Sequence, residues 1–486
     1  MATLPINTTG PGWNFDNSYA RLPERLFARV PPTPVRSPRL VLLNEPLARE
    51  LGLDPDWLAS KDGLAVLAGN AIAEGSEPIA QAYAGHQFGH FTMLGDGRAH
   101  LLGEQIAPDG RRVDIQLKGS GPTPFSRSGD GRAALGPMLR EHLVSEAMHA
   151  LGIPTTRGLA VVATGEPVLR DSILPGAVLV RVATSHLRVG TFQFARATGA
   201  PELLQAILAH AIARHDPDIV GADNAALALV GRVMARQAAL VARWMAVGFV
   251  HGVMNTDNMS IAGETIDYGP CAFMDRFDPA TVFSSIDRGG RYAYANQPLI
   301  AQWNLVRLAE ALLPAIDADE ARAVEMANEA VNRFPAMFEA QWLRQFRGKL
   351  GLFTEEEGDR ALIEDLLAGL HEARLDYTAS FAALARGGAP AHPALEAWAG
   401  RHEARLGRQA QSGADALKLM QSASPAAIPR NHVVEAALAA AEGGDLAPVR
   451  QLLNALERPF DHAGVAAELA GPPPEPSAPY RTFCGT

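Results

Sequence analysis

Residues 111–118, in the first third of the chain, alternate apolar and polar positions with a period of two residues. The turn-forming run Pro108-Asp109-Gly110 joins them to a preceding segment, residues 99–106. This pattern predicts a β-hairpin. In the second segment the apolar side chains occupy alternate positions, so Lys118 should lie on the opposite face of the strand.

Further strands are expected over residues 155–194. Within this region residues 178–182 form an apolar run that is broken only by Arg181, which predicts a buried strand carrying one charge. A buried guanidinium requires an anionic partner. A phosphate group suits its planar set of donors. Arg170 and Arg188 lie in the same region.

A helix is predicted between these two strand regions. It begins at Pro137, because proline suits the first turn of a helix. Its apolar stripe is Leu139, Leu143, Ala147, Ala150 and Leu151. Glu141 and Glu146 lie about 140° apart around such a helix, so at most one of them can face Lys118.

From about residue 200 onward the apolar positions recur at helical spacing, apart from a central loop and the segment that follows it. The predicted helices cover residues 202–213, 227–247, 305–313, 321–334 and 432–441. Residues 1–60 are rich in proline and contain one short helical pattern at 45–51. Residues 471–479 form a proline-rich linker that leads to the C-terminus.

Composition narrows the class of protein. The chain has 486 residues, of which 47% are hydrophobic, and this is enough for a large core in two lobes or domains. The net charge of −10 argues against nucleic acid as the main partner, because phosphate backbones need a basic surface. The N-terminus lacks the features of a signal peptide, and arginines interrupt the longest apolar stretch, residues 225–250. We therefore expect a soluble cytoplasmic protein with no membrane partner.

Lysine is rare in this chain, which has only four lysines against 39 arginines among its 43 basic residues. A lysine at the end of a predicted strand, in a chain that otherwise uses arginine, suggests that a compact ammonium group is needed at position 118. The alternative is that Lys118 is a solvated strand end.

Three oxygen-bearing side chains cluster in the middle of the chain, where the motif HGVMNTDN at residues 251–258 is followed by IDYG at 266–269. Asp257, Asn258 and Asp267 fall within eleven positions. Carboxylate and amide oxygens are the ligands that Mg²⁺ and Mn²⁺ prefer. A carboxylate beside a metal can also accept a proton from an attacking hydroxyl group. The alternative is a polar turn, which Asn and Asp favour.

Two glycine-rich segments precede this motif. Gly95-Asp96-Gly97 permits a positive φ and close approach to a phosphate, although an ordinary hairpin turn explains it equally well. Residues 119–132 form a loop with Gly, Ser, Arg and Asp, which suits either a nucleotide or a plain surface loop. His86 and His90 have a spacing that could ligate a metal, but packing and hydrogen-bonding roles are the stronger interpretation.

Together these features follow the order of a protein kinase, namely a glycine turn, a strand lysine, a helix glutamate, a catalytic loop and an Asp-x-Gly motif. We therefore expect an α+β, protein-kinase-like bilobal fold. Its expected parts are an N-terminal arm at 1–60, a β-rich N-lobe at 61–190, a helical C-lobe at 191–470 and a flexible tail at 471–486.

One position departs from the kinase pattern. Phosphotransferases of the aminoglycoside type carry an aspartate two residues after the histidine of this motif, whereas this chain carries Val253. Asp257 is the nearest substitute for the missing base. Ordinary phosphoryl transfer is thereby put in doubt, while nucleotide and metal binding are not.

Five longer motifs carry a resemblance to a known family. They are FDNSYA at 15–20, YAGHQFG at 83–89, LKGSG at 117–121, SEAM at 145–148 and HGVMNTDNM at 251–259. The chain resembles the selenoprotein O family of pseudokinase-like protein adenylyltransferases, the YdiU-type proteins of bacteria. The resemblance runs essentially from end to end, and the last motif is long and specific.

The resemblance implies a kinase-like fold that binds ATP in a flipped orientation, so that the α-phosphate faces the acceptor. The implied reaction transfers AMP to a Ser, Thr or Tyr hydroxyl of a protein and releases pyrophosphate, and some members are assigned UMP transfer from UTP. Asp257 is the implied proton acceptor, Asn258 and Asp267 are implied ligands of Mg²⁺ or Mn²⁺, and Glu141 pairs with Lys118. The implied nucleotide contacts are Gly95, Gly97, Arg98, Lys118, Asp130, Gly131, Arg181, Arg188 and Asp267.

Two other functions stay open at this point. One is a kinase for a protein or a small molecule that uses Asp257 as an ordinary base. The other is a catalytically inactive nucleotide-binding scaffold, although such a scaffold has no need of all three oxygen ligands.

The chain contains two cysteines, Cys271 and Cys484. Cys271 lies four residues after Asp267, and Cys484 lies in the C-terminal tail, where the family resemblance places redox-active residues. We expect a reversible disulfide between them that pins the tail near the active site. The alternative is two unrelated free thiols, which the reducing cytosol favours.

Overall fold

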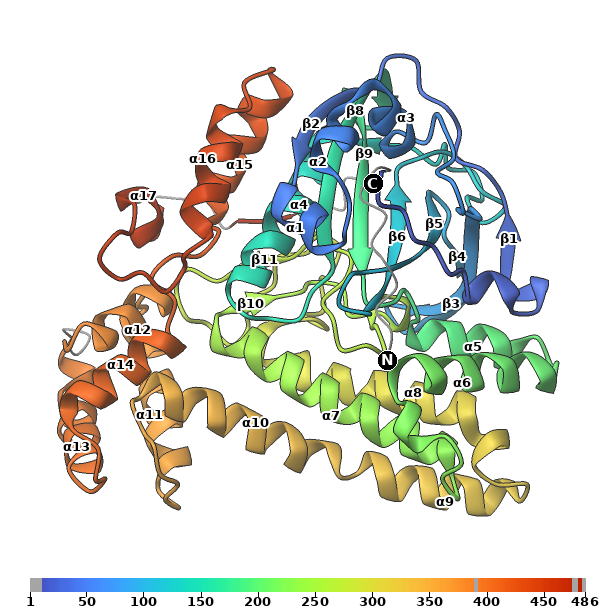
Figure 1. The fold of residues 1–486 in the computed structure, drawn as a ribbon. Coiled ribbons are helices and arrows are strands. Elements are labelled where there is room, and N and C mark those ends of the chain that lie inside the picture. The colour runs from blue at the N-terminus through green and yellow to red at the C-terminus, as the bar shows by residue number, and fades with distance from the viewer. Residues whose placement is uncertain (1–10, 389–391, 474–479, 483–486) are drawn as a thin grey trace.

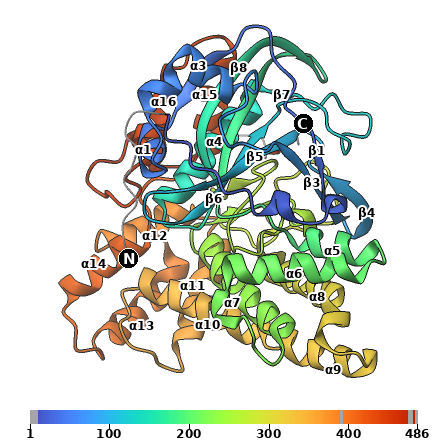
Figure 2. The same ribbon diagram turned by 45° about the vertical axis from the view of Figure 1, so that its right-hand side comes forward.

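The computed structural model describes residues 11–388, 392–473 and 480–482. Within these residues the protein is a mixed α/β structure with one large antiparallel sheet and a helical half. Figure 1 shows the sheet in the upper part of the molecule and the long helices below it. Residues 251–296, drawn in yellow-green, lie between these two parts in Figures 1 and 2.

The described residues form nine strands in the large sheet, and all neighbouring strands pair antiparallel. Their order across the sheet is β1 (Phe27–Arg29), β3 (Ile79–Gln87), β5 (Ala99–Ile106), β6 (Arg112–Lys118), β9 (Ile173–Ala183), β8 (Arg157–Leu169) and β2 (Arg39–Leu43). Outside this order, β4 (His90–Gly95) pairs with β3 and β7 (Ala133–Ala134) pairs with β9. A separate pair consists of β10 (Phe249–Val250) and β11 (Ala272–Phe273).

The predicted hairpin is confirmed, because β5 and β6 pair from Ala99↔Lys118 to Ile106↔Arg112. The alternation in β6 also holds. Its apolar residues Val113, Ile115 and Leu117 enter a core shared with the short helices α1 (Glu45–Glu50), α2 (Pro55–Ala59) and α3 (Lys61–Leu67). Lys118 therefore lies on the other face, where α4 (Leu135–Ala150) packs against β8 and β9.

The helical half is built mainly from long helices whose apolar faces join one continuous core. They are α5 (Val189–Ala197), α6 (Pro201–His215), α7 (Ala225–Ala246), α8 (Gln297–Ile316), α9 (Glu320–Val331), α10 (Phe334–Lys349), α11 (Asp359–Glu372), α12 (Tyr377–Ala385), α13 (Glu396–Leu406) and α14 (Gly413–Ala423). The predicted helices of this region are confirmed, with boundaries shifted by a few residues or, for α8, by a full turn or two. Helix α4 begins two residues before Pro137.

The chain then returns to the sheet. Helices α15 (Asn431–Glu442) and α16 (Ala447–Leu456) pack against α4, and the short α17 (Ala467–Ala470) follows them. Figure 1 shows these red helices beside the upper half of the molecule rather than below it. As a result, α15 borders the same region as the strand-borne Lys118.

One prediction for the region that precedes α6 was wrong. Residues 189–194, expected as a strand, belong to α5, which is buried on most of its sides and therefore shows no amphipathic period. The glycine- and histidine-rich segment is the hairpin β3–β4, with Phe88 at φ 49° and Gly89 at φ 90° in its turn. The register pairs Gln87 with His90, so the side chains of His86 and His90 point to opposite faces and cannot form a metal-binding pair.

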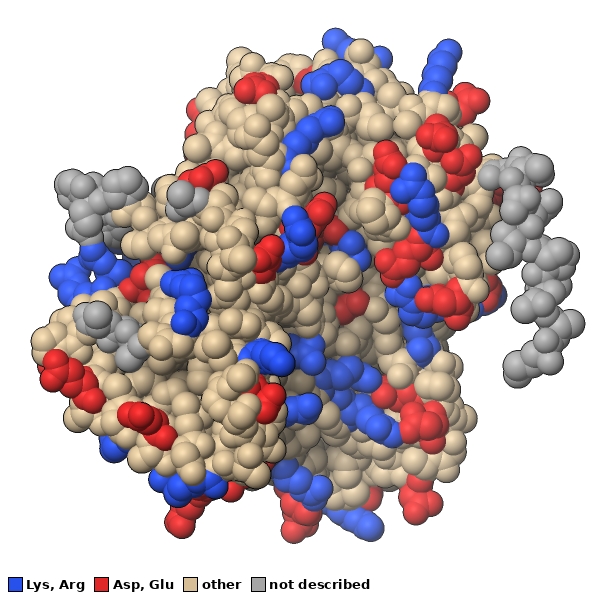
Figure 3. All heavy atoms as spheres, turned by 60° about the vertical axis from the view of Figure 1, so that its left-hand side comes forward, with Lys and Arg blue, Asp and Glu red and all other residues tan. Residues whose placement is uncertain are grey.

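Acidic and basic side chains are interspersed over the face that Figure 3 shows. By length and composition alone, two described helices could cross a membrane, namely Ala225–Ala246 and Tyr294–Ile316. About half of each is buried inside the protein, as in core helices that pass the same test, so this is weak support for a membrane span.

One buried charge in the helical half carries a stability consequence. Lys349 ends α10 and is 1% exposed, with its ammonium 4.1 Å from the centre of the Phe381 ring and 5.5 Å from that of Tyr377. Burial lowers the pKa of Lys349 from 10.5 to about 7. The cation–π contacts offset only part of the lost hydration.

Replacing Lys349 with Met is expected to raise the free energy of unfolding at pH 7 by about 1–3 kcal/mol, because it removes a buried charge. The pKa of Lys349 is lower in the folded state, so the unfolded chain binds more protons between about pH 7 and 10.5. The free energy of unfolding of the wild type therefore rises with pH through this window, whereas that of the variant lacks this contribution.

Urea unfolding at both ends of the window measures the difference between the two proteins. The matched control is Lys61→Met, because Lys61 is exposed. Equal gains in both variants would contradict the prediction.

Candidate functional site

A cavity of about 1200 Å³ opens between the sheet, the 251–296 region and α15. All residues predicted from the sequence to contact the nucleotide, bind the metal, act as the base or pair with Lys118 line this cavity. They are Gly95, Gly97, Arg98, Lys118, Asp130, Gly131, Glu141, Arg181, Arg188, Asp257, Asn258 and Asp267. A cavity of this size accommodates a nucleoside triphosphate and leaves room for an acceptor group.

The centre of the cavity wall is the carboxylate of Asp267, which contacts three cationic side chains. Its Oδ1 lies 3.0 Å from the Lys118 ammonium and 2.6 Å from Arg181 Nη1, and its Oδ2 lies 2.8 Å from Arg188 Nη1. Each of the three cations is less than a tenth exposed. Burial alone would raise the pKa of Asp267, but the three cations hold it well below its usual value.

Glu141 on α4 completes this network. Its two oxygens lie 2.6 Å from the Lys118 ammonium and 3.2 Å from Arg181 Nη1. The sequence analysis allowed only one of two glutamates to face Lys118, and Glu141 is that residue. Glu146 instead accepts from Arg157 and Asn44. Lys118 is thus a buried, doubly paired ammonium and not a solvated strand end.

The loop that carries Asp267 is held in an unusual backbone conformation. Asp267 has φ 62°, which non-glycine residues rarely adopt. The neighbouring Ile266 is fully buried, and its carbonyl accepts a hydrogen bond from His251 Nε2 at 2.9 Å. On the other side, the Gly269 N–H donates to the Asp267 carbonyl at 2.8 Å. These contacts fix the carboxylate, and His251 contributes from the central motif by holding the loop.

Asp257 lies in a single 3₁₀ turn, Thr256–Asn258, and is 7% exposed. Among the described residues its Oδ1 has no hydrogen-bond partner. Burial raises the pKa of Asp257 to about 6, and the nearby Arg188 opposes this shift. Arg188 also donates to the Asp257 carbonyl at 2.8 Å, so one guanidinium connects the two aspartates. A buried carboxylate with a free oxygen and a raised pKa is suited to accept a proton.

Two glycines make room for this aspartate. A Cβ at Gly85, inside strand β3, would lie 2.2 Å from Asp257 Oδ1. A Cβ at Gly190, in α5, would lie 1.9 Å from the Ala84 carbonyl oxygen. The sequence analysis did not identify Gly85, although a glycine inside a strand often marks the close approach of another group.

Asn258 and Asp267 were the predicted metal ligands. Asn258 Nδ2 donates to the Val253 carbonyl at 3.1 Å, which leaves its Oδ1 as the oxygen that can face a cation. The described residues contain no cluster of three or more His, Cys, Asp or Glu side chains that could hold a metal alone. The donor set therefore fits a hard cation that is completed by phosphate oxygens and water, as is usual for Mg²⁺.

The glycine turn works differently from the expectation. Neither Gly95 nor Gly97 has a positive φ. Instead, a Cβ at Gly95 would lie 2.3 Å from the Phe125 ring, and one at Gly97 would lie 2.9 Å from the Phe125 carbonyl oxygen. These glycines let the 119–132 loop pack closely against the turn. Of the two, Gly97 also accepts a hydrogen bond from the Ser126 hydroxyl through its carbonyl.

The remaining predicted contacts lie at the cavity margin. The exposed Asp130 carboxylate pairs with Arg170 at 2.9 Å. Gly131 has φ 68°, and a Cβ there would lie 2.1 Å from the Gly121 carbonyl carbon, so this position requires glycine. Arg98 lines the cavity, and its backbone carbonyl accepts from the Gly119 N–H at 2.7 Å.

Several cavity residues were missed by the sequence analysis. Asp96 is buried with its pKa raised to about 6 by burial, and Tyr83 lies with its ring centre 4.6 Å from the Arg188 guanidinium carbon. The two glycines that flank Asp96 could have indicated that this aspartate lies at the cavity. Nothing in the sequence pattern indicated that Glu435 of α15 lines the same cavity and pairs with Arg140 at 3.0 Å.

Cys271 is a fully buried free thiol, and burial raises its pKa to about 11. Cys484 lies outside the described residues, so the disulfide stays a prediction. The last described residues do approach this region. Thr482 donates from its N–H to the Phe283 carbonyl at 2.8 Å and from its hydroxyl to the Pro270 carbonyl at 2.8 Å.

Comparisons with known proteins identify the family of this chain. Residues 12–457 match the family model described as "Protein adenylyltransferase SelO". The chain is 58% identical to "Protein nucleotidyltransferase YdiU" of Anoxybacillus flavithermus over 98% of this chain and 99% of the relative. It is 56% identical to the protein of the same name from Syntrophotalea carbinolica, with both chains covered in full. A third relative of that name, from Methylorubrum populi, is 59% identical over 97% of this chain and 99% of its own length. The chain therefore belongs to the SelO family of protein adenylyltransferases, a family of nucleotide-transferring enzymes.

Proposed function

We propose that this protein transfers AMP from ATP to Ser, Thr or Tyr hydroxyl groups of proteins and releases pyrophosphate. Nucleotide transfer to proteins follows from the family, while the residue roles and the acceptor type are our inference. One observation carries this proposal. A single cavity contains a buried Asp257 oxygen without a hydrogen-bond partner and, near it, three cations that converge on Asp267.

In the proposed reaction the acceptor oxygen attacks the α-phosphorus of ATP. The bond from that phosphorus to the oxygen bridging it to the β-phosphate breaks, and pyrophosphate leaves. The hydroxyl proton passes to Asp257. Lys118, Arg181 and Arg188 supply positive charge for the leaving pyrophosphate, and such charge stabilises the transition state most in a water-poor site.

Asp267 has two proposed roles. Without nucleotide it compensates the three cations, and with nucleotide it shares them with the phosphates and contacts the substrate. Asn258 and Asp267 would hold Mg²⁺ or Mn²⁺, which when bound neutralises phosphate charge and orients the triphosphate. The oxygen-only donor set and the spare Asn258 Oδ1 support this assignment.

A protein-kinase-like bilobal architecture is part of the proposal. The buried Lys118–Glu141 pair of 2.6 Å, the strand-to-helix order and the Asp267 loop support it. Under this proposal residues 61–190 and 191–470 are the two lobes, residues 1–60 the arm and 471–486 the tail. The proposed location is the cytoplasm, and the proposed partners are hydroxyl-bearing proteins and ATP or UTP, without nucleic acid or membrane.

Labelled ATP separates the proposal from its alternatives. Incubation with a protein acceptor and Mg²⁺ should leave label on protein from α-labelled ATP and none from γ-labelled ATP. Label on protein from γ-labelled ATP would identify a protein kinase, and γ-label on a small molecule would identify a small-molecule kinase. No transfer of either label to any acceptor would favour an inactive scaffold. The same assay with α-labelled UTP compares UMP with AMP transfer.

Asp257→Ala is expected to lower transfer by ~10²–10⁴-fold, because it removes the general base. ATP binding should persist, since the three cations and Asp267 are untouched. Asp257→Asn is the matched variant that keeps the shape but not the basicity. Calorimetry of ATP binding beside the α-label assay measures both quantities, and near-normal transfer by either variant would overturn the role of Asp257.

Asp267→Ala is expected to abolish the dependence of ATP binding on Mg²⁺, because the cation loses one of two protein ligands. It should also lower stability by ~3–5 kcal/mol, since it leaves three buried cations without their common partner. Calorimetry with and without Mg²⁺ measures the first effect and urea unfolding the second. Asp223→Ala, at an exposed position away from the cavity lining, serves as the control for general loss of acidic charge. An unchanged Mg²⁺ effect would count against the metal assignment.

Gly85→Ala is expected to lower transfer by at least ~10-fold while ATP binding changes little. The added methyl group would lie 2.2 Å from Asp257 Oδ1 and must displace that carboxylate. Gly231→Ala is the control, because nothing lies within 4 Å of the added atom in α7. Equal activity of the two variants would show that the position of Asp257 is not critical.

A further inference from the structure

Strand β4 has a free edge. It pairs with β3, and within the described parts of the chain no other strand pairs with it. The N–H of His86 on β3 points away from β4, because it donates to the Thr256 hydroxyl at 2.7 Å. Its cross-strand neighbour Phe91 therefore belongs to a pair that is not hydrogen-bonded, as does Met93 two residues later. The backbone N–H and C=O groups of Phe91 and Met93 consequently face away from β3.

This edge lacks the usual protection of edge strands. Natural proteins cover such strands or place charged residues or proline on them. β4 has the sequence HFTMLG, with no Lys, Arg, Asp, Glu or Pro. The side chains of its outward positions are apolar and half-exposed, at 46% for Phe91 and 47% for Met93. An apolar, unprotected edge that persists in a protein indicates that another strand pairs with it.

The edge lies beside the proposed reaction centre. Gly85 of β3 abuts Asp257, and Leu94 and Gly95 of β4 line the cavity. Neighbouring strands are about 4.8 Å apart, so a strand added to β4 would lie roughly 10 Å from β3. A hydroxyl-bearing side chain that points toward the cavity from such a strand can approach Asp257.

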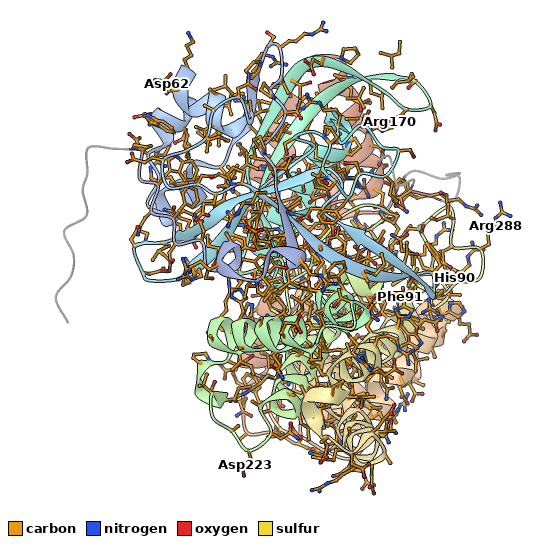
Figure 4. The ribbon with its side chains drawn as sticks, turned by 90° about the vertical axis from the view of Figure 1, so that its right-hand side faces the viewer. Asp62, His90, Phe91, Arg170, Asp223 and Arg288 are labelled. Carbon is orange, nitrogen blue, oxygen red and sulfur yellow. The ribbon has the colours of Figure 1, made fainter. Side chains whose placement is uncertain are left out.

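Two other exposed apolar side chains lie at the cavity that Leu94 and Gly95 of β4 line. Leu169 is 73% exposed and Ile286 is 62% exposed, and both line the cavity. Figure 4 shows His90 and Phe91 on the same side of the molecule as Arg170, the neighbour of Leu169, and Arg288. The mouth of the cavity is thus rimmed by apolar groups, as expected where a protein docks.

The side chains behind the edge are aromatic and cationic. His86 contacts both Phe91 and Trp303, with ring centres 5.2 Å apart in each case. Arg291 and Arg307 lie over the Trp303 ring, at 4.8 and 5.1 Å from its centre. Arg307 also pairs with Glu310, so the positive charge available to acidic side chains of a bound segment comes mainly from Arg291.

We propose that an extended segment of the protein substrate pairs with β4 as an added strand. Its backbone bonds the free edge, alternate apolar side chains pack on Phe91 and Met93, and acidic side chains lie near Arg291 and Arg307. The opposite face of the segment carries the acceptor hydroxyl toward the cavity. This inference rests on the proposed function, because it says where the protein substrate of the proposed AMP transfer binds. Strand addition draws affinity from the main chain and therefore tolerates many sequences.

The test uses a set of fluorescent ten-residue peptides that alternate valine with serine, tyrosine or glutamate. Anisotropy measures their binding to the full chain in the presence of a non-hydrolysable ATP analogue. Phe91→Lys and Met93→Lys should each weaken binding by at least ~10-fold, because a charge on the edge blocks strand addition. The matched control is Ile72→Lys, since Ile72 is equally exposed at 46% but lies elsewhere. Only every second residue of an added strand donates its N–H to β4. Of two peptides N-methylated at odd or at even positions, one should therefore bind well and the other poorly.

Equal peptide binding by the edge variants and Ile72→Lys overturns the inference, as does failure of the wild type to bind any peptide. The α-label assay separates the two proposals. Peptide binding at β4 without AMP transfer leaves the docking edge standing and sinks the proposed function. AMP transfer with the same KM for peptide in Phe91→Lys and Ile72→Lys overturns the docking edge alone. A wild-type dimer in light scattering that Phe91→Lys dissociates would assign the edge to a second copy instead.

Discussion

The structure depends on one carboxylate that holds three buried cations together. Lys118 ends β6, Arg181 lies within β9 and Arg188 precedes α5, and all three contact Asp267 from the central loop. Without that carboxylate Glu141 would still pair with Lys118 and Arg181, but the three buried charges would be incompletely compensated, at a cost in stability. The rare φ of Asp267 fits this role, because the surrounding contacts hold a conformation that the residue would not choose alone.

The same network prepares the cavity for an anion. The cations are already desolvated and oriented, so a triphosphate that shares them with Asp267 meets little cost of reorganisation. Arg188 joins this cluster to Asp257 by donating to its carbonyl. Asp257 nevertheless keeps one carboxylate oxygen unbonded, in a space that Gly85 leaves open. In the proposed reaction, the cations that compensate the leaving group and the base that accepts the proton are therefore neighbouring but separate groups.

Local pattern predicted much of the fold where an element has a polar face and an apolar face. The β5–β6 hairpin and helix α4 followed from alternation, a turn sequence and a helix-starting proline. Helix α5 and the β3–β4 hairpin did not. The first is buried on most sides, and the second is rich in glycine and small residues because Asp257 and α5 approach it closely. In both places tertiary contacts, and not local periodicity, selected the residues.

The sequence by itself determined the chemistry available to this protein. An isolated lysine among arginines, a buried strand arginine and the oxygen-rich central motif identified the charged groups, and end-to-end motifs identified the family. Only the tertiary structure decided how these groups meet, which glycines make room for Asp257, and that α15 closes the cavity. It alone also showed that, among the described residues, only β3 pairs with β4. Residue type sets charge and hydrogen-bonding capacity, whereas contacts between residues far apart in the chain depend on how its elements pack.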